Sequence, residues 1–416
     1  MNANNLAQLH KYVPPKWASS LKNIPKHSLK LAQRNTPIHP WNIPNAPKEF
    51  SIFIKRDDLT GCALSGNKVR KLEFVLADAL EKKSDTVITC GGLFSNHCRT
   101  TAVATKQLGL NCYLLLSCSD QVIQQLYLSL TFCSSSTTCC YKTVNVGCKG
   151  NLLLNRMAGS NIILVPELKY EAGLQPMMEK MAEKLIIWHS EKRITNKILR
   201  VKGLTITSWE RQQGSVPYLI EAGGSSYTGL FGYLTAFQEM MDQNLLEDFD
   251  DIVMAAATGG SAAGISIANY LTGSKLKCHA VNVRDDDAYV YSKINEELQA
   301  AGLSVQAEEI IDVIGGYHLP GYGRPSQEDL EYILEISSST GVLIDPVYNI
   351  KTVRGMLAEM TNNPKRFRGN RILYIHTGGC FGLFDGGVES LLTSSRGTQC
   401  INEILSWRDI NDPLPI

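Results

Sequence analysis

The sequence lacks an excess of charge of either sign. Its 41 Lys and Arg nearly balance its 40 Asp and Glu, which leaves a formal net charge of +1 over 416 residues. The protein therefore has no broad electrostatic field of one sign with which to bind nucleic acid or an anionic membrane surface. The chain also lacks any apolar run near the ~20 residues that a membrane-spanning helix needs. We therefore expect neither a nucleic acid nor a membrane as a partner.

Pairs of the form CxxC are absent, although the chain holds 12 Cys. Cysteines without such pairs, in a chain long enough to bury a core, do not indicate a disulfide framework. Five of the Cys fall within 118–148, where no His is near, so a metal site there is only the lesser alternative. A composition of 44% hydrophobic and 19% charged residues excludes wholesale disorder. The length predicts two domains.

Acidic residues are missing from the first 48 positions, which hold seven basic residues. An acid-poor start is typical of transit peptides. Six of the seven are Lys rather than Arg, however, and prolines such as Pro14, Pro15 and Pro25 prevent an amphipathic helix. We therefore expect a soluble N-terminal arm of a cytoplasmic protein, with mitochondrial import as the alternative.

Short β-branched runs alternate with helix-length segments through most of the chain. Near-continuous apolar strands separated by helices are typical of parallel sheets covered on both faces. We therefore predict the α/β class. The expected strands are 51–55, 86–90, 112–116, 161–165, 216–220, 252–256, 278–283, 342–345 and 371–376. The expected helices are 71–81, 97–108, 228–241, 261–271, 327–337 and 349–360.

Three glycine-rich turns, 90–97, 221–226 and 258–264, each follow an expected strand and precede an expected helix. Ligands of open α/β sheets bind beyond the carboxyl ends of the strands, where helix N-termini point free N–H groups outward. The third turn suits a phosphate best, because Gly259 and Gly260 allow close approach while Thr258 and Ser261 add hydroxyl groups. It is neither G-x-G-x-x-G nor a P-loop. We therefore expect the phosphate of a compact cofactor, although such turns can also be purely architectural.

A lysine, Lys68, lies where a polar loop gives way to an expected helix. A helix N-terminus disfavours a positive charge and helps to lower the pKa of an amine. A lysine that forms a Schiff base needs such a lowered pKa, because it must lose its proton to attack an aldehyde. Taken alone, the pattern is more typical of a solvated lysine at an exposed helix start.

Eight strings resemble one enzyme family in their order and spacing: FIKRDDLTGCALSGNKVRKLEF, GGLFSNHCRTTAVA, GNLLLNR, EAGGSS, TGGSAAG, GYGRP, DPVYNIKT and HTGG. The chain is similar to the D-cysteine desulfhydrase and 1-aminocyclopropane-1-carboxylate (ACC) deaminase branch of the pyridoxal-phosphate enzymes. The resemblance implies the two-domain tryptophan-synthase-β-like fold and pyridoxal phosphate as the cofactor. It covers nearly the whole chain except two irregular stretches, 118–148 and 192–214.

The resemblance also implies roles for residues at the matching positions. Lys68 would hold pyridoxal phosphate as a Schiff base and later carry a proton, and Lys71 would reach the phosphate. Asn96 would hydrogen-bond the ring oxygen of the cofactor, while Ser95, Asn96 and His97 would hold the carboxylate of a small amino-acid substrate.

Further positions complete this implied site. Tyr322 and Tyr348 match two active-site tyrosines, and Asn349 and Thr377 match positions beside the cofactor. The implied phosphate cradle consists of Thr258, Gly259, Gly260, Ser261 and Ala262.

Two positions tend to separate the activities within this family. ACC deaminases typically carry Glu after DPVY and Leu in the later His-x-Gly-Gly motif, whereas desulfhydrases carry Ser or Thr and then Thr. Here the residues are Asn349 and Thr377. We expect D-cysteine desulfhydrase activity, with ACC deaminase as the alternative. Phe94 replaces the usual Gln before Ser95, which keeps open a third alternative, a catalytically degenerate protein that only binds the cofactor.

The expected large domain combines 1–68 with 215–416, and the expected small domain is 69–214. The two irregular stretches, 118–148 and 192–214, would be insertions in the small domain or errors in the coding sequence. The resemblance implies a homodimer.

Overall fold

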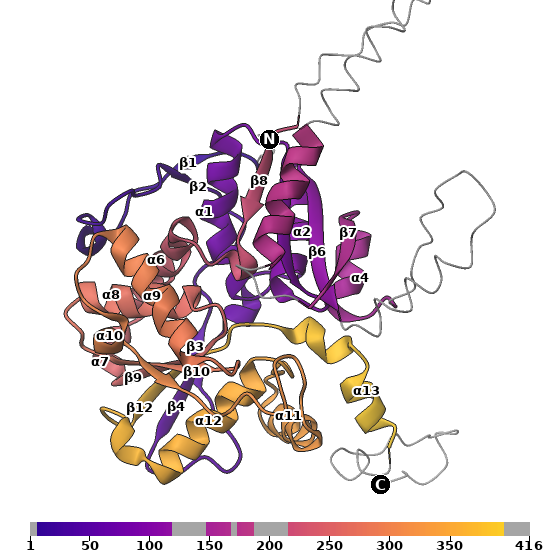
Figure 1. The fold of residues 1–416 in the computed structure, drawn as a ribbon. Coiled ribbons are helices and arrows are strands. Elements are labelled where there is room, and N and C mark those ends of the chain that lie inside the picture. Colours follow the sequence, from indigo (N-terminus) through magenta and orange to yellow (C-terminus); the bar gives the residue numbers. More distant parts are fainter. Residues whose placement is uncertain (1–5, 119–146, 168–172, 187–214, 395–416) are drawn as a thin grey trace, which may run out of the picture.

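Two sheets organise the part of the chain that the computed structural model describes, residues 6–118, 147–167, 173–186 and 215–394 (Figure 1). The larger sheet has the order β11-β10-β9-β12-β4-β3 and the smaller one the order β7-β6-β5-β8. A short antiparallel pair, β1 with β2, lies apart from both. The strands of the larger sheet are β3 (Ile38–Pro40), β4 (Ser51–Lys55), β9 (Asp251–Ala256), β10 (Lys277–Asn282), β11 (Asp312–Ile314) and β12 (Arg371–Ile375).

The remaining strands are β1 (His10–Lys11), β2 (His27–Ser28), β5 (Thr86–Gly92), β6 (Asn111–Cys118), β7 (Asn161–Pro166) and β8 (Pro217–Ile220). All pairings within the two larger sheets are parallel except that of β3 with β4. Every residue of β9 is buried, as expected of a parallel strand covered on both faces. The predicted α/β class is confirmed.

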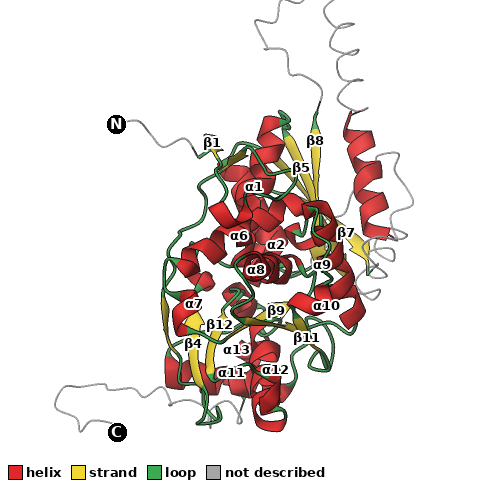
Figure 2. Cartoon of the chain, turned by 90° about the vertical axis from the view of Figure 1, so that its left-hand side faces the viewer, coloured by secondary structure: helices red, strands yellow, loops and turns green. Residues whose placement is uncertain are grey.

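Helices cover the faces of both sheets (Figure 1). Helix α1 contacts both α2 and α6, so it links the layers around the two sheets. Helix α8 is seen end-on in the middle of Figure 2, between strands of the two sheets. The helices are α1 (Asn67–Glu81), α2 (Asn96–Gln107), α4 (Gly150–Met157), α6 (Tyr227–Met241), α7 (Leu245–Asp248), α8 (Gly260–Leu271), α9 (Asp287–Ala301), α10 (Ala307–Ile310), α11 (Gln327–Thr340), α12 (Asn349–Asn362) and α13 (Gly387–Leu392).

Several expected elements are wrong or missing. The expected strand 342–345 is not a strand, because the Asp345 carboxylate accepts hydrogen bonds from the backbone N–H groups of Val347, Tyr348 and Asn349 and so turns the chain into α12. The sequence pattern also missed helix α9 and the strands β3 and β11.

The expected domain boundary after residue 214 assigned the strand 216–220 to the large domain. In the structure this strand is β8, and it pairs with β5 from Thr86 to Thr89 in the smaller sheet. This parallel pairing satisfies the backbone groups of β8, so the strand belongs to the smaller sheet.

The proline-rich N-terminal arm is part of the folded protein. The ring of Tyr12 contacts that of Phe74, with centroids 4.8 Å apart. Trp17 packs edge-on against Phe237 and donates a 2.7 Å hydrogen bond from Nε1 to Gln238. The arm therefore contributes to the core that surrounds α6.

Most of the two irregular stretches lies outside the described residues, and so does the Cys-rich segment weighed as a metal site. Within the residues that are described, no helix combines the length and the apolar character needed to cross a membrane.

Candidate active site

Lys68 lies in the first turn of α1, and the loop before it fixes its position. The N–H group of Gly66 donates to the Thr60 hydroxyl at 2.8 Å, and that of Asn67 donates to the carbonyl of Thr377 at 3.0 Å. Gly66 has a φ of 101°, and a Cβ there would lie 2.9 Å from the Thr377 carbonyl oxygen. A glycine is therefore required for this close approach to the chain after β12.

The Lys68 amino group points at the glycine turn that follows β8. Its Nζ atom donates to the carbonyl oxygen of Gly223 at 3.2 Å. Burial of the amino group lowers the pKa of Lys68 to about 8. Desolvation is thus the main cause of the lowered pKa, which the sequence pattern attributed to the helix N-terminus.

Lys71, one turn further along α1, reaches the same carbonyl. Its Nζ atom donates to Gly223 at 3.0 Å and to the Ser225 hydroxyl at 3.2 Å. Burial, followed by repulsion from Lys68, lowers the pKa of Lys71 well below its ordinary value. Neither amino group forms an ion pair with a residue that the structure describes, although the Glu297 carboxyl lies near enough to raise the pKa of Lys71 in part. Two adjacent buried amines without an ion-paired carboxylate are well suited to an anion.

The glycine turn before α8 lies beside these lysines. The Thr258 hydroxyl is 2.7 Å from that of Ser225, and the Ser261 hydroxyl accepts a hydrogen bond from Asn67 at 3.0 Å. A Cβ at Gly260 would lie only 2.6 Å from the Ser225 oxygen. The N–H groups of the first turn of α8, from Gly260 to Ala262, lack partners within the helix. They form an anion site at a helix N-terminus.

Ser95, Asn96 and His97 begin α2, after β5. The Ser95 hydroxyl caps the helix by accepting from the N–H of Cys98 at 3.2 Å. Asn96 is 8% exposed, and its Oδ1 atom accepts from Asn151 at 2.9 Å. The Ser95 N–H donates to the Gly92 carbonyl at 3.0 Å, so the N–H groups of Asn96 and His97 remain for the carboxylate that the resemblance implies.

The side chain of His97 is committed elsewhere. The Thr89 hydroxyl donates to the carbonyl of Ile220 at 2.8 Å, so at 2.9 Å it accepts from His97 Nε2. Burial, then Lys68 and Lys71, lower the pKa of His97 well below its ordinary value. The imidazole is therefore neutral, and only the backbone N–H of His97 can serve a substrate carboxylate.

Tyr322 and Tyr348 meet on the other side of the site. Their hydroxyl groups are hydrogen-bonded to each other, and their ring centroids lie 5.9 Å apart. Burial raises the pKa of both phenols, so both are protonated near neutral pH. Arg284 lies 5.9 Å from the Tyr322 ring.

Asn349 is fully buried at the start of α12, and both of its amide hydrogens are used. Nδ2 donates to Asp345 at 2.6 Å and to the carbonyl of Gly378 at 2.7 Å, while Oδ1 accepts from the Tyr374 hydroxyl at 2.8 Å. The neighbouring Thr377 is 8% exposed. Its hydroxyl makes no hydrogen bond to any of the described residues, so it is available to a ligand.

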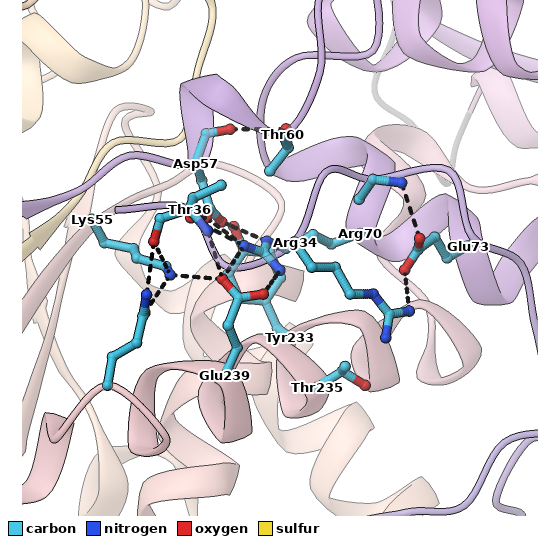
Figure 3. Close-up of polar contacts among 12 residues, drawn as sticks. Arg34, Thr36, Lys55, Asp57, Thr60, Arg70, Glu73, Tyr233, Thr235 and Glu239 are labelled. Atoms are coloured by element: carbon cyan, nitrogen blue, oxygen red, sulfur yellow. Dashed lines mark hydrogen bonds and ion pairs between the residues drawn. The ribbon is translucent and has the colours of Figure 1, made fainter. Parts of the chain in front are cut away.

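A buried ionic network anchors α1 behind the site, and sequence reasoning missed it (Figure 3). The guanidinium of Arg70 binds both oxygens of Asp57, at 2.7 and 2.9 Å, and both oxygens of Glu239, each at 3.0 Å. Lys55 donates to Glu239 at 2.7 Å. Asp57 and Arg70 stand in the first family-like string, but Glu239 is more than 160 positions away in α6. Nothing in the sequence pairs them.

One other group could resemble a metal site. Ligand atoms of Asp58, His376 and Cys380 lie within 4.8 Å of one another. Arg56 binds both Asp58 oxygens, at 2.7 and 2.9 Å. His376 accepts from the N–H of Gly378 and contacts the Leu343 carbonyl through its other nitrogen. These atoms already have protein partners, and we assign no metal to them.

The assembled residues fit pyridoxal phosphate. Lys68 offers an amine with a pKa of about 8, and Lys71 with the first turn of α8 offers cationic and N–H groups for a phosphate. A Cβ at Gly223 would lie 2.7 Å from the Thr258 hydroxyl oxygen and 3.2 Å from the Lys68 Nζ atom, so glycine keeps this cradle open. Bound there, the cofactor would supply an electron sink for the α-carbon of an amino acid, and these side chains would supply its binding and proton transfer.

Comparisons with known proteins agree with this chemistry. Residues 29–378 match a family model described as "Pyridoxal-phosphate dependent enzyme". An Arabidopsis thaliana protein named bifunctional D-cysteine desulfhydrase/1-aminocyclopropane-1-carboxylate deaminase, mitochondrial, is 38% identical, with 90% of this chain and 83% of that protein covered. A Klebsiella pneumoniae protein named D-cysteine desulfhydrase is 31% identical, with 80% and 88% covered.

A solved structure, described as an ACC deaminase homologue, superposes with a TM-score of 0.68 at 29% identity and covers 91% of this chain and 99% of its own. The expected cofactor and fold are thereby confirmed. The chain belongs to the D-cysteine desulfhydrase and ACC deaminase family of pyridoxal-phosphate-dependent lyases, which share the tryptophan-synthase-β-like fold.

Proposed function

We propose that this lyase is a D-cysteine desulfhydrase, which converts D-cysteine and water into pyruvate, ammonia and hydrogen sulfide. The observation that carries the proposal is the position after Tyr348. Asn349 stands there, with no carboxylate and with both amide hydrogens already donated to Asp345 and Gly378. Thr377, the second discriminating position, offers a free hydroxyl.

The neutral side chain of Asn349 matters because a carboxylate at this position keeps the pyridine nitrogen of the cofactor protonated. A protonated ring is the stronger electron sink, and a neutral partner leaves it weaker. A weaker sink is sufficient when thiolate leaves from Cβ, because thiolate is a good leaving group. Opening a cyclopropane ring that has no α-hydrogen demands more. Asn349 and Thr377 therefore favour elimination from D-cysteine.

The residues of the site divide the work as follows in this proposal. The N–H groups of Asn96 and His97, with the hydroxyl of Ser95, hold the substrate carboxylate. Lys68 Nζ takes the proton from the α-carbon, and the C–S bond breaks as sulfide leaves. Of the two protonated phenols, Tyr322 and Tyr348, one donates to the other, and the one that accepts can donate its own hydrogen to the departing sulfur. The released 2-aminoacrylate then hydrolyses to pyruvate and ammonia.

The direct test measures sulfide and pyruvate from D-cysteine beside 2-oxobutyrate from ACC, with L-cysteine as the control. We expect sulfide and pyruvate in equal amounts from D-cysteine, and none from a Lys68→Ala variant. Release of 2-oxobutyrate from ACC without sulfide from D-cysteine would overturn the proposal in favour of ACC deaminase.

A cofactor-binding protein without activity is the remaining alternative, because Phe94 replaces the usual Gln before Ser95. Its side chain is 41% exposed. The visible absorption band of the lysine-bound cofactor distinguishes the two cases. We expect D-cysteine to change this band in the wild-type protein. A band that is present yet unaffected by D-cysteine would support the binding protein.

Assembly and location are further expectations. We propose a homodimer, which the family resemblance supports, and light scattering of the purified protein measures it. We also propose the cytosol as the compartment, supported by the arm that packs through Tyr12 and Trp17 into the core. Cell fractionation that places the full-length protein in mitochondria would contradict this location.

A further inference from the structure

Two buried polar residues near the site have no role in the chemistry above. Arg99 lies in α2 and Asn151 in the adjacent α4, and they are 0% and 1% exposed. Arg99 has no carboxylate partner in the described structure. Its guanidinium donates instead to the carbonyl oxygens of Ala63 at 2.6 Å and Ser65 at 3.0 Å, and to Asn151 Oδ1 at 3.2 Å.

These contacts fix the orientation of the Asn151 side-chain amide and, through it, that of the Asn96 side-chain amide. An arginine has only donors, so the Asn151 atom that faces Arg99 must be the carbonyl oxygen. Asn151 Nδ2 then donates both of its hydrogens, to the Phe94 carbonyl at 2.8 Å and to Asn96 at 2.9 Å. The Asn96 atom that receives this bond must in turn be Oδ1.

The Nδ2 group is therefore the end of the Asn96 amide that Asn151 does not contact. It makes no hydrogen bond to any residue that the structure describes, and it lies 3.0 Å from the place that a Cβ of Gly379 would occupy. Its two donors are free for a ligand between α2 and the chain after β12. A rotated Asn96 would present a carbonyl oxygen there instead.

A glycine brings this arrangement about. Gly150 has a φ of 52°, and a Cβ there would lie 2.8 Å from the carbonyl oxygen of Phe381. The first residue of α4 is thus pressed against the turn after β12. This close approach places the next residue, Asn151, within reach of Asn96.

We propose that Arg99 and Asn151 are positioning residues that orient the Asn96 amide, so that its N–H donors face the ring oxygen of pyridoxal phosphate. The inference rests on the site role proposed for Asn96. A donor stabilises an anionic ring oxygen, whereas a carbonyl in its place would repel it. We call the chain of hydrogen bonds from Arg99 through Asn151 to Asn96 the relay. The relay therefore favours binding of the cofactor with its ring oxygen ionised.

The test compares two matched variants of α4. Asn151→Leu removes the relay. Asn155→Leu changes another fully buried Asn one turn later, whose amide atoms have no partner among the described residues. The readouts are the dissociation constant for pyridoxal phosphate and the pH at which the visible band of the bound cofactor changes. No substrate is present, so failure of the proposed D-cysteine activity does not affect the result.

We expect Asn151→Leu to weaken cofactor binding about tenfold or more, the scale of one hydrogen bond to a charged group. We expect the spectral transition to shift to higher pH, because the oxygen loses a donor and holds a proton more strongly. Asn155→Leu should match the wild type within about twofold. Equal effects of the two variants, or none from Asn151→Leu, would overturn the inference.

Two further variants separate positioning from general loss of structure. Asn151→Asp keeps the size and can still accept from Arg99, but as a carboxylate it cannot donate to Asn96; it should therefore behave as Asn151→Leu does even if the latter folds poorly. In an Asn96→Ala background, Asn151→Asp should weaken binding by no more than about twofold, because its effect passes through Asn96. Equal weakening in both backgrounds would show that Asn151 acts independently and would refute the relay.

Discussion

At the scale of single residues, the site is governed by how burial treats its two lysines. Lys68 and Lys71 donate to one carbonyl, that of Gly223, and neither forms an ion pair with a described carboxylate. Burial lowers the pKa of both. Before the cofactor binds, the site therefore holds an amine ready to lose its proton, beside a second amine that gains from an incoming phosphate.

This arrangement makes cofactor capture depend on pH. Only the uncharged amine of Lys68 attacks an aldehyde, and burial lowers the pKa of that amine to about 8. We expect the rate at which the cofactor-free protein acquires the visible band to rise with pH around a midpoint near 8. Stopped-flow absorbance measures it. A midpoint at the ordinary lysine pKa of about 10.4 would contradict the burial of Lys68.

The same shift affects stability in a defined window. Between about pH 8 and the ordinary value of about 10.4, the unfolded chain holds a proton on Lys68 that the folded one lacks. The contribution of Lys68 to the stability of the cofactor-free protein therefore increases as pH rises through this window.

At the scale of elements, the buried network of Asp57, Arg70, Glu239 and Lys55 keeps α1, with its two lysines, in place against α6 (Figure 3). Although burial alone would raise the pKa of Glu239, hydrogen bonds and charge from Arg70 and Lys55 lower it to about 2. This carboxylate therefore stabilises the fold above its ordinary pKa of about 4.3. That stabilisation is lost as pH falls towards 2.

Removing this carboxylate should be costly. Glu239→Gln leaves Arg70 and Lys55 buried without one of their counter-charges, and breaking such a buried pair costs about 3–5 kcal/mol. We expect a decrease of that size in the free energy of unfolding, measured by urea denaturation, together with weaker cofactor retention.

A control lies at the C-terminal end of α1. Lys82 forms an exposed pair with Asp78 at 2.7 Å, and Lys82→Met should cost no more than about 1 kcal/mol. A Glu239→Gln variant no less stable than Lys82→Met would show that the network does not anchor α1.

At the scale of the whole molecule, the site exists only where segments from both sheets meet. Lys68 lies in α1, which precedes β5 of the smaller sheet, and Asn96 lies in α2, which follows β5. Thr258 and Thr377 instead follow β9 and β12 of the larger sheet. The N-terminal arm runs across this assembly and packs on α1 and α6 through Tyr12 and Trp17. Its contacts should therefore stabilise the whole fold.

The arm gives a direct test of that role. Trp17→Ala removes the contact with Phe237, at 6.0 Å between centroids, and the hydrogen bond to Gln238. We expect destabilisation of about 2–3 kcal/mol, below the usual range for a fully buried Trp because Trp17 is only partly buried. The melting temperature measures it, with the exposed Lys16→Ala as the control. Equal melting temperatures would show that the arm is not part of the cooperative fold.

Much of the fold was predictable because its signals are local. Apolar runs such as 252–256 indicated parallel strands, and the glycine turn 258–264 gave a candidate phosphate site. The strand 342–345 was mispredicted because its apolar run precedes a carboxylate cap at Asp345, and the placement of β8 depended on a pairing across more than 120 residues.

The sequence by itself determined the α/β class, the candidate lysines and the motif residues, because periodicity and the conformational freedom of glycine act along a few neighbouring positions. Only the tertiary structure decided what each side chain could still do. Burial and the charges of Lys68 and Lys71 keep His97 neutral, and its Nε2 hydrogen is donated to Thr89. Both amide hydrogens of Asn349 are donated to Asp345 and Gly378, and Asn96 directs its donors outward because of Asn151. The direction of a hydrogen bond depends on its partner, and several of these partners come from distant segments of the chain.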